Sequence, residues 1–297
     1  MSTREILVTG GTGQVGRELA RYAWPEGWAA TVPTRAELDI TDPAAISAKL
    51  AERRWATVIN AAAYTAVDSA EIHQLAAWTV NALAPAAFAE GCRAAGIPLV
   101  QVSTDYVFDG AKQGAWAVDD PVGPLGVYGA SKLGGELAIR TSGARHAIIR
   151  TAWVVSPHGQ NFVKTMLRVG AEQPVLRVVA DQHGSPTSAA DLAGALATVA
   201  MRISDDPAAP TGVFHFANSG PTTWHGFAQA VFEAAAARGV PRAKVEAITT
   251  PDYPTRAKRP VNSLLSTARI EAEYEIKPRA WAAALEPILD ELIGARK

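Results

Sequence analysis

Tyr128 and Lys132 are the two side chains whose spacing most directly suggests chemistry. They stand four residues apart in the segment YGASK, so on a helix they share one face. A nearby ammonium stabilises a phenolate, which predicts that Lys132 lowers the pKa of Tyr128 from about 10 toward working pH. Tyr128 would then donate a proton to a carbonyl that is being reduced, and Lys132 can also bond a nicotinamide ribose. The alternative is a solvated helix face.

Thr104 supplies a third group for the same reaction. It follows an apolar stretch that predicts a strand over 97–103, upstream of the Tyr–Lys pair. Open α/β sheets bind ligands at the carboxyl ends of their strands. A hydroxyl at that place can orient the carbonyl oxygen that Tyr128 protonates. The three side chains together predict the reduction of a carbonyl.

Glycines at positions 10, 13 and 16 follow the chain's first apolar run. Gly10 permits a tight turn, and Gly13 lets backbone N–H groups approach phosphate oxygens. Gly16 lets the following helix pack close to the sheet. This strand–turn–helix context predicts a dinucleotide whose pyrophosphate lies on a helix N-terminus, and a glycine-rich turn without a ligand is the alternative.

Alternating elements must position these groups. Strands are predicted over 4–9, 29–33, 56–60, 97–103 and 146–152, and helices over 14–24, 43–54, 71–95 and 128–141. This alternation is typical of a Rossmann-type α/β fold with a doubly wound parallel sheet.

The pattern becomes irregular after about residue 153, which predicts a smaller, interleaved C-terminal lobe for the substrate. The helices predicted after residue 153 cover 161–172, 188–201, 224–238 and 280–293, and the strands predicted there cover 175–179, 213–216 and 245–249. Because 188–216 again reads as helix then strand, the predicted dinucleotide domain comprises 1–153 plus about 188–216. The predicted substrate lobe comprises about 154–187 plus 217–297.

Composition restricts the class of protein. The 297 residues carry a net charge of −1, so the chain lacks the excess positive charge that is typical of proteins that bind nucleic acid or a membrane surface. No apolar run reaches the length of a membrane span, and the first residues run straight into a predicted strand without room for a signal peptide. The single cysteine, Cys92, cannot form an internal disulfide. A cytoplasmic protein without nucleic-acid or membrane partners is therefore expected.

Nine segments resemble the extended short-chain dehydrogenase/reductases and, among them, the dTDP-4-dehydrorhamnose reductase family. STDYVFDG, RTAWV and DQHGSPT are the segments most specific to that family. The segments run from end to end of the chain: Thr9–Gly16, Leu38–Thr41, Asn60–Glu71, Ser103–Gly110, Tyr128–Glu136, Arg150–Val154, Asn161–Arg168, Asp181–Thr187 and Arg259–Leu265.

The resemblance implies hydride transfer from NAD(P)H to C4 of dTDP-4-dehydro-L-rhamnose, which yields dTDP-L-rhamnose. Tyr128 would protonate the developing alkoxide, Thr104 would hold it, and Lys132 would tune Tyr128 and bind ribose. With the glycine motif, the resemblance assigns these residues to the cofactor: Gly10, Thr12, Gly13, Gln14, Val15, Gly16, Arg35, Asp39, Ile40, Ala61, Ala62, Ala63, Tyr64, Asn81, Ser103, Tyr128 and Lys132.

The end of the second predicted strand bears on the choice of cofactor. NAD-specific folds place a carboxylate there for the ribose 2′-hydroxyl, whereas this chain has Thr34-Arg35. Arginine suits a 2′-phosphate, which favours NADPH over the alternative, NADH. The resemblance places Asp39 at the adenine amino group and Ile40 against its ring.

The substrate side is assigned mainly through the resemblance, to Thr65, Val67, Thr104, Asp105, Tyr106, Tyr128, Trp153 and Arg259. Related 4,6-dehydratases carry an acidic pair after the threonine. Here Asp105 is followed by Tyr106, which favours simple reduction. Arg259 belongs to a basic cluster expected to hold the diphosphate, and free exposed charge is its alternative.

Some family members hold Mg²⁺ between subunits. Glu18 matches one such position, but Ala190 stands where a second carboxylate would lie, so no metal site is predicted. A homodimer is the expected assembly. Two alternative functions remain, namely a ketoreductase for another nucleotide-linked 4-keto-deoxysugar and a non-catalytic NADP-binding regulatory subunit.

Overall fold

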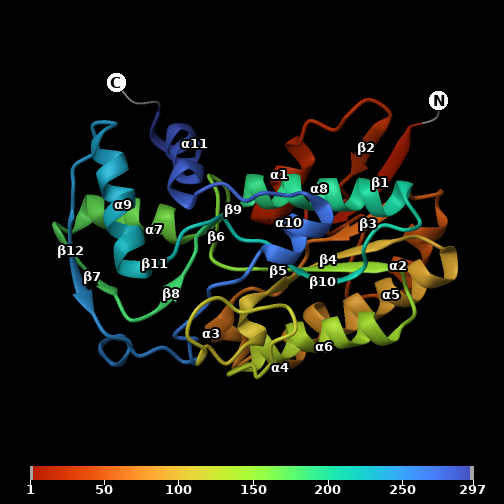
Figure 1. The fold of residues 1–297 in the computed structure, drawn as a ribbon, viewed down its shortest axis with the longest axis horizontal. Coiled ribbons are helices and arrows are strands. Elements are labelled where there is room, and N and C mark those ends of the chain that lie inside the picture. Colours follow the sequence, from red (N-terminus) through yellow and green to blue (C-terminus); the bar gives the residue numbers. More distant parts are fainter. Residues whose placement is uncertain (1–2, 295–297) are drawn as a thin grey trace.

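The computed structural model describes residues 3–294 and centres on a sheet of parallel strands in the order β10-β5-β4-β3-β1-β2 (Figure 1). The strands are β1 (Arg4–Thr9), β2 (Trp28–Thr31), β3 (Thr57–Asn60), β4 (Leu99–Thr104), β5 (His146–Thr151) and β10 (Gly212–His215). Ile6, Leu7 and Val8 of β1 are fully buried, as expected where helices cover both faces of a parallel sheet. The predicted doubly wound fold is confirmed.

Helices cover the two faces of this sheet (Figure 1). On one face lie α1 (Gln14–Arg21) and α8 (Ala189–Asp205), whose apolar side chains pack on Ile6, Val8 and Ile149. On the other face lie α2 (Pro43–Ala51), α5 (Ala84–Ala95) and α6 (Val127–Thr141), which enclose Leu7, Val58 and Ile148. The sheet thus places the carboxyl ends of β1, β3, β4 and β5 along one edge.

The segment predicted as one helix over 71–95 differs from that prediction. It consists of α4 (Gln74–Trp78), a π-helical turn (Thr79–Leu83) and α5. Pro85, in the first turn of α5, has no N–H and cannot continue the α-helical ladder. The helix predicted over 14–24 ends at Arg21, and two short helices, α3 (Val67–Ala70) and α10 (Ala268–Tyr274), were not predicted.

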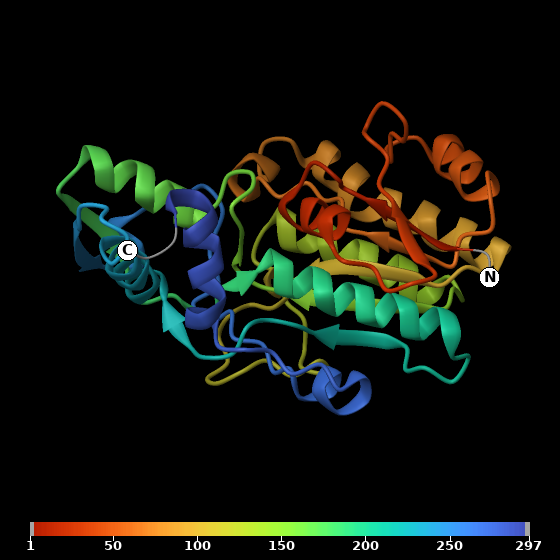
Figure 2. The ribbon, with the colours of Figure 1, turned by 90° about the horizontal axis from the view of Figure 1, so that it is seen from above.

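A smaller lobe lies at one end of the sheet (Figure 2). It contains α7 (Phe162–Glu172), α9 (Trp224–Ala236) and α11 (Trp281–Ile293), with the parallel pair β7 (Val175–Val179) and β12 (Lys244–Ile248). Two further pairs of short strands are present. Strand β8 (His183–Gly184) pairs with β11 (Thr222–Thr223), and β6 (Val154–Val155) pairs with β9 (Thr187–Ser188).

Between these segments the chain returns to the main sheet. Helix α8 packs on α1, and β10 pairs in parallel with β5. The residue limits of the two predicted domains stay a prediction, and their first two and last three residues lie outside the described residues.

Candidate active site

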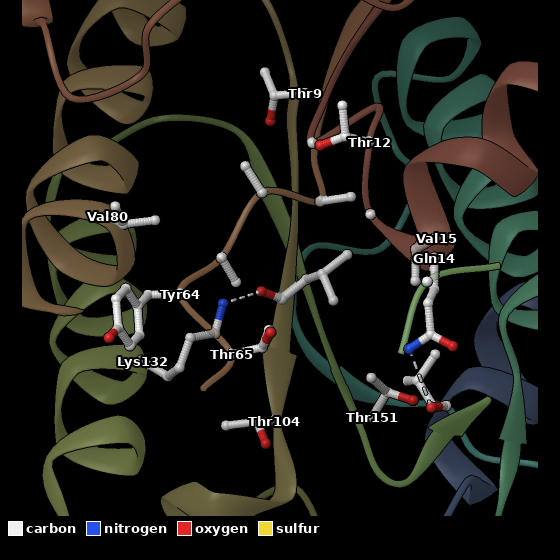
Figure 3. A pocket seen from close by; sticks show the side chains of 18 of the residues that line it. Thr9, Thr12, Gln14, Val15, Tyr64, Thr65, Val80, Thr104, Lys132 and Thr151 are labelled. Atoms are coloured by element: carbon white, nitrogen blue, oxygen red, sulfur yellow. Dashed lines mark hydrogen bonds between the residues drawn. The ribbon is translucent and has the colours of Figure 1, made fainter. Parts of the chain in front are cut away.

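A cavity of about 790 Å³ opens at the carboxyl ends of β1, β3, β4 and β5. Its walls come from the turn after β1, the loop after β3, the start of α6 and the smaller lobe. Figure 3 shows that Gln14 and Thr151 lie across the cavity from Tyr64 and Lys132. The cavity therefore spans the edge of the sheet at which ligand binding was predicted.

Most of the predicted site residues line this cavity. They are Gly10, Thr12, Gly13, Gln14, Val15, Arg35, Asp39, Ile40, Ala61, Ala62, Ala63, Tyr64, Thr65, Val67, Ser103, Thr104, Asp105, Tyr106, Tyr128, Lys132 and Trp153. Three predicted residues lie elsewhere: Gly16, Asn81 and Arg259.

The glycine turn forms a cradle that a side chain would fill. Gly10 has φ of 77°, and a Cβ there would lie 2.7 Å from the backbone nitrogen of Ala62. A Cβ on Gly16 would lie 2.1 Å from the carbonyl oxygen of Gly10, so Gly16 permits close packing beneath the turn. The N-terminus of α1 is thereby open to an anion, as a pyrophosphate site requires.

Thr104, Tyr128 and Lys132 meet in the cavity because α6 approaches the end of β4 closely. A Cβ on Gly129 would lie 2.1 Å from the carbonyl oxygen of Tyr106, so glycine is needed at this contact. Thr104 lies beside the Tyr128 hydroxyl, and its own hydroxyl donates to Asp105 Oδ1 at 3.0 Å. Lys132 Nζ donates to the carbonyl oxygen of Val102 at 2.6 Å, as Figure 3 shows.

The electrostatics differ from the sequence-based expectation. Burial of the Tyr128 hydroxyl raises its pKa to about 12, although the neighbouring Thr104 acts in the opposite direction. Burial also lowers the pKa of Lys132 to about 8, against the pull of Glu136. The prediction that Lys132 lowers the Tyr128 pKa is therefore wrong for this structure, since loss of hydration outweighs the other influences. Tyr128 holds its proton at neutral pH.

Asp105 is a buried carboxyl beside these groups. Burial raises its pKa to about 6, while hydrogen bonds with Ser263 and Thr104 favour the charged form. Its neighbour Tyr106 packs edge-to-face on Tyr128, with ring centroids 5.3 Å apart.

A buried ion pair lies behind the reactive groups. Arg150 Nη2 donates to Glu136 Oε2 at 2.7 Å, and Arg150 Nε donates to Oε1 at 2.9 Å. The Ser103 hydroxyl donates to the same carboxylate at 2.5 Å. Both charged side chains are at most 2% exposed. Since Glu136 lies one turn beyond Lys132 on α6, this network and the Lys132 bond attach one face of α6 to β4.

Stacked indoles form the wall of the cavity on the side of the smaller lobe. Trp153 and Trp224 lie with ring centroids 3.6 Å apart and an interplanar angle of 13°. Trp153 has φ of 50°, an unusual backbone conformation for a bulky residue. Gly184 leaves room for its ring. Trp224 was missed in the sequence because nothing local to it indicates contact with Trp153.

Asn81 and Arg259 act from outside the lining. Asn81 is buried and holds the loop after β3 by accepting from Tyr64 N at 2.8 Å and donating to Tyr64 O at 3.1 Å. Arg259 pairs with Asp68, and its Nη1 is buried with no hydrogen-bond partner. Arg259 also lies close enough to lower the pKa of Tyr106 against the effect of burial.

The far end of the cavity carries the residues predicted for adenosine. The side chain of Arg35 is 83% exposed, and its Nη2 lies 4.0 Å from Asp39 Oδ2. The Asp39 carboxylate accepts from Thr41 N and Oγ1, and these bonds lower its pKa. Arg35 is therefore free to meet an anion at the cavity mouth.

Comparisons with known proteins agree with this geometry. The sequence profile of the RmlD substrate binding domain family matches residues 4–293. A dTDP-4-dehydrorhamnose reductase of Aggregatibacter actinomycetemcomitans is 40% identical over 286 residues, which cover 95% of this chain and 97% of the relative. The chain belongs to the dTDP-4-dehydrorhamnose reductase family. It is therefore an oxidoreductase, as the sequence predicts.

Two solved members of this family have the same fold. The Clostridium acetobutylicum reductase superposes with a TM-score of 0.90 at 35% identity, covering 97% of this chain and 99% of that one. The Bacillus anthracis reductase, solved in complex with NADP, has a TM-score of 0.90 at 31% identity with the same coverage.

Two further observations concern residues 3–294. No helix in this range is both long and apolar enough to cross a membrane. No group of three or more His, Cys, Asp or Glu side chains in this range is placed to hold a metal ion. Glu18, the position linked by resemblance to a metal, instead bonds Arg21 at 2.8 Å.

Proposed function

We propose that this protein reduces the C4 ketone of dTDP-4-dehydro-L-rhamnose to dTDP-L-rhamnose, with NADPH as the reductant and Tyr128 as the proton donor. The observation that carries this proposal is the convergence of Thr104, Tyr128 and Lys132 in one cavity with the open N-terminus of α1. The names of the related reductases supply the substrate.

The roles of the protein's own groups follow from their positions. Tyr128 is protonated at neutral pH, so its hydroxyl is in the state needed to protonate the C4 oxygen. Thr104, which lies beside that hydroxyl, would align the same oxygen. Lys132 holds its place through Val102 and, from the same cavity, would bond the nicotinamide ribose.

The residues of the glycine turn fit a dinucleotide. A Cβ on Gly10 or Gly16 would collide with backbone, and Gly13 lies at the N-cap of α1, where a pyrophosphate would be held. NADPH bound there supplies the hydride for the carbonyl carbon. Arg35 would hold the 2′-phosphate, and the NADP complex of the B. anthracis reductase supports this choice over NADH.

The substrate would occupy the other half of the cavity. Trp153, Tyr106, Thr65 and Val67 line the cavity and would contact the sugar. Arg259 lies near Tyr106 but outside the lining, so its assignment to the diphosphate rests on the resemblance alone.

Substrate-dependent consumption of NADPH tests the proposal. The purified protein is mixed with dTDP-4-dehydro-L-rhamnose, and separately with other 4-keto nucleotide sugars, with either NADPH or NADH. Turnover should be fastest with the rhamnose precursor and NADPH. If only another keto sugar is turned over, the proposed ketone reduction stands but the proposed substrate is wrong. NADPH binding with no turnover on any sugar would favour the regulatory alternative.

The assembly and location stay predictions. A homodimer in the cytoplasm was expected from the sequence, and sedimentation of the purified protein, with and without its ligands, tests the oligomeric state.

A further inference from the structure

Gln14 connects the cofactor turn to the smaller lobe. It is the first residue of α1, yet its side chain bonds a single loop, residues 154–161, here called the bridging loop. Gln14 Nε2 donates to Val154 O at 3.3 Å, as Figure 3 shows. Gln14 Oε1 accepts from Ser156 Oγ and from Asn161 Nδ2, each at 3.0 Å. One side chain thus contacts the start, middle and end of the loop.

The bridging loop is braced internally, so a constraint at one point reaches the others. Ser156 Oγ accepts from His158 N at 3.0 Å, and Asn161 Nδ2 donates to Ser156 O at 2.7 Å. Asn161 Oδ1 accepts from Lys164 N and caps α7. Ser156 is only 1% exposed, which protects these bonds from water.

A second contact joins α1 to the same loop one turn further along. Glu18 Oε1 lies 3.6 Å from His158 Nε2. Both atoms are buried, and neither has a hydrogen-bond partner. Helix α1 therefore faces the bridging loop at two successive turns, through Gln14 and Glu18.

The bridging loop also borders the proposed sugar site. Trp153 immediately precedes it, and Asn161 at its end lines the cavity. The ring centroid of Phe162, the next residue, lies 4.7 Å from that of Trp224. Trp224 in turn stacks on Trp153 with ring centroids 3.6 Å apart. A continuous path of contacts therefore leads from the N-terminus of α1 to the stacked indoles.

We propose that Gln14 and Ser156 are positioning residues that couple occupancy of the cofactor site to affinity for the nucleotide sugar. This inference rests on the proposed function, because it assigns the two ligands to the two halves of the cavity. A dinucleotide at the glycine turn fixes α1, and Gln14 then fixes the bridging loop and the wall that it carries. Coupling of this kind is reciprocal, so the nucleotide sugar also raises the affinity for the dinucleotide by the same factor.

Calorimetric titration of dTDP-L-rhamnose measures the coupling directly. The full-length protein is titrated with and without saturating NADPH, since both ligands are in the reduced state and no hydride can transfer. In the wild type, NADPH should lower the dissociation constant of dTDP-L-rhamnose by about fivefold or more. In Gln14→Leu and in Ser156→Ala, the tightening should fall to less than about twofold. The reverse titration should give the same factors.

Ser185→Ala is the matched control. Ser185 is also a buried serine whose hydroxyl joins two segments, through Asn218 O and Gly220 O, but it does not touch Gln14 or the bridging loop. It should keep the full coupling. Ser156→Ala removes only one hydroxyl, so it provides a measurement even where Gln14→Leu fails to fold.

The outcomes separate the two proposals. Equal coupling in the wild type and in Ser156→Ala and Gln14→Leu would overturn the positioning role, as would two ligands that bind the wild type without influencing each other. Failure of the wild type to bind either ligand would overturn the proposed function, and the positioning role with it.

Discussion

The two halves of the cavity are built in different ways. The half that holds Thr104, Tyr128 and Lys132 uses the end of β4 and helix α6, which Lys132 joins through Val102 and Glu136 joins through Ser103. Arg150 of β5 completes the buried ion pair with Glu136. The half that holds Trp153 and Trp224 uses packed indoles from distant segments. Proton transfer requires fixed distances, which buried charge networks provide, whereas recognition of a sugar requires shaped apolar surface. Substitutions in the two halves should therefore fail in different ways.

The largest effect is expected for Tyr128→Phe. This change removes the proton donor while keeping the ring that packs on Tyr106. We expect kcat to fall by about 100- to 10,000-fold, the usual contribution of a positioned general acid. NADPH affinity, measured by fluorescence titration, should change by less than about twofold, because the phenol ring remains. Unchanged turnover would remove Tyr128 from the reaction.

Glu136→Gln should show that the reactive half depends on its buried charges. The change leaves the Arg150 guanidinium buried without a counter-charge, which costs about 3–5 kcal/mol in the free energy of unfolding. Urea denaturation measures this loss. Glu273→Gln is the control, because Glu273 forms a more exposed pair with Arg269 and should change stability by less than about 1 kcal/mol. Equal losses in the two variants would contradict the argument.

The same division explains what could be predicted from the sequence. The glycine turn and the Tyr–Lys pair are local patterns, in which spacing along a strand, turn or helix determines which atoms face the ligand. The alternation of strands and helices likewise predicted the parallel sheet. Spacing could not reveal the burial that raises the pKa of Tyr128, because burial depends on segments that pack against it.

Two contacts of the recognition half could not be predicted, for the same reason. The contact of Trp224 with Trp153 depends on how the smaller lobe folds back, and it follows from no local period. Arg259 was selected as part of a basic cluster, but its pairing with Asp68 could not be seen in the sequence. The π-helical turn before Pro85 was missed because its apolar pattern resembles that of an ordinary helix.

Asp105→Asn should stabilise the folded protein at neutral pH, because it removes a buried carboxylate from the reactive half. The pKa of Asp105 is raised from 3.8 to about 6 by burial, so between these pH values the folded protein binds more protons than the unfolded chain. Its stability contribution therefore falls as pH rises from about 4 to 6, by up to about 3 kcal/mol. The variant should unfold at higher urea than the wild type at pH 7, and this difference should vanish near pH 4.

Asp120→Asn gives a control of opposite sign. The bond from Lys112 lowers the Asp120 pKa, so the charged form stabilises the folded protein and this variant should lose stability at pH 7. A wild type more stable than Asp105→Asn at pH 7 would show that hydrogen bonds to the Asp105 carboxylate outweigh its burial.

The smallest effect is expected in the recognition half, for Trp224→Leu. The leucine keeps an apolar wall but removes the stacked ring that holds Trp153 at its unusual φ. Stacking of this kind contributes about 0.5–1.5 kcal/mol beyond buried area, so KM for the nucleotide sugar should rise up to about tenfold. Because sugar and transition state are held equally by this wall, kcat should change by less than about twofold. Trp281→Leu, which removes an indole packed on Phe227 outside the cavity, should leave KM unchanged. A fall in kcat at constant KM in Trp224→Leu would instead show that Trp224 contributes to the reaction itself. The distinction between the two halves of the cavity would then be wrong.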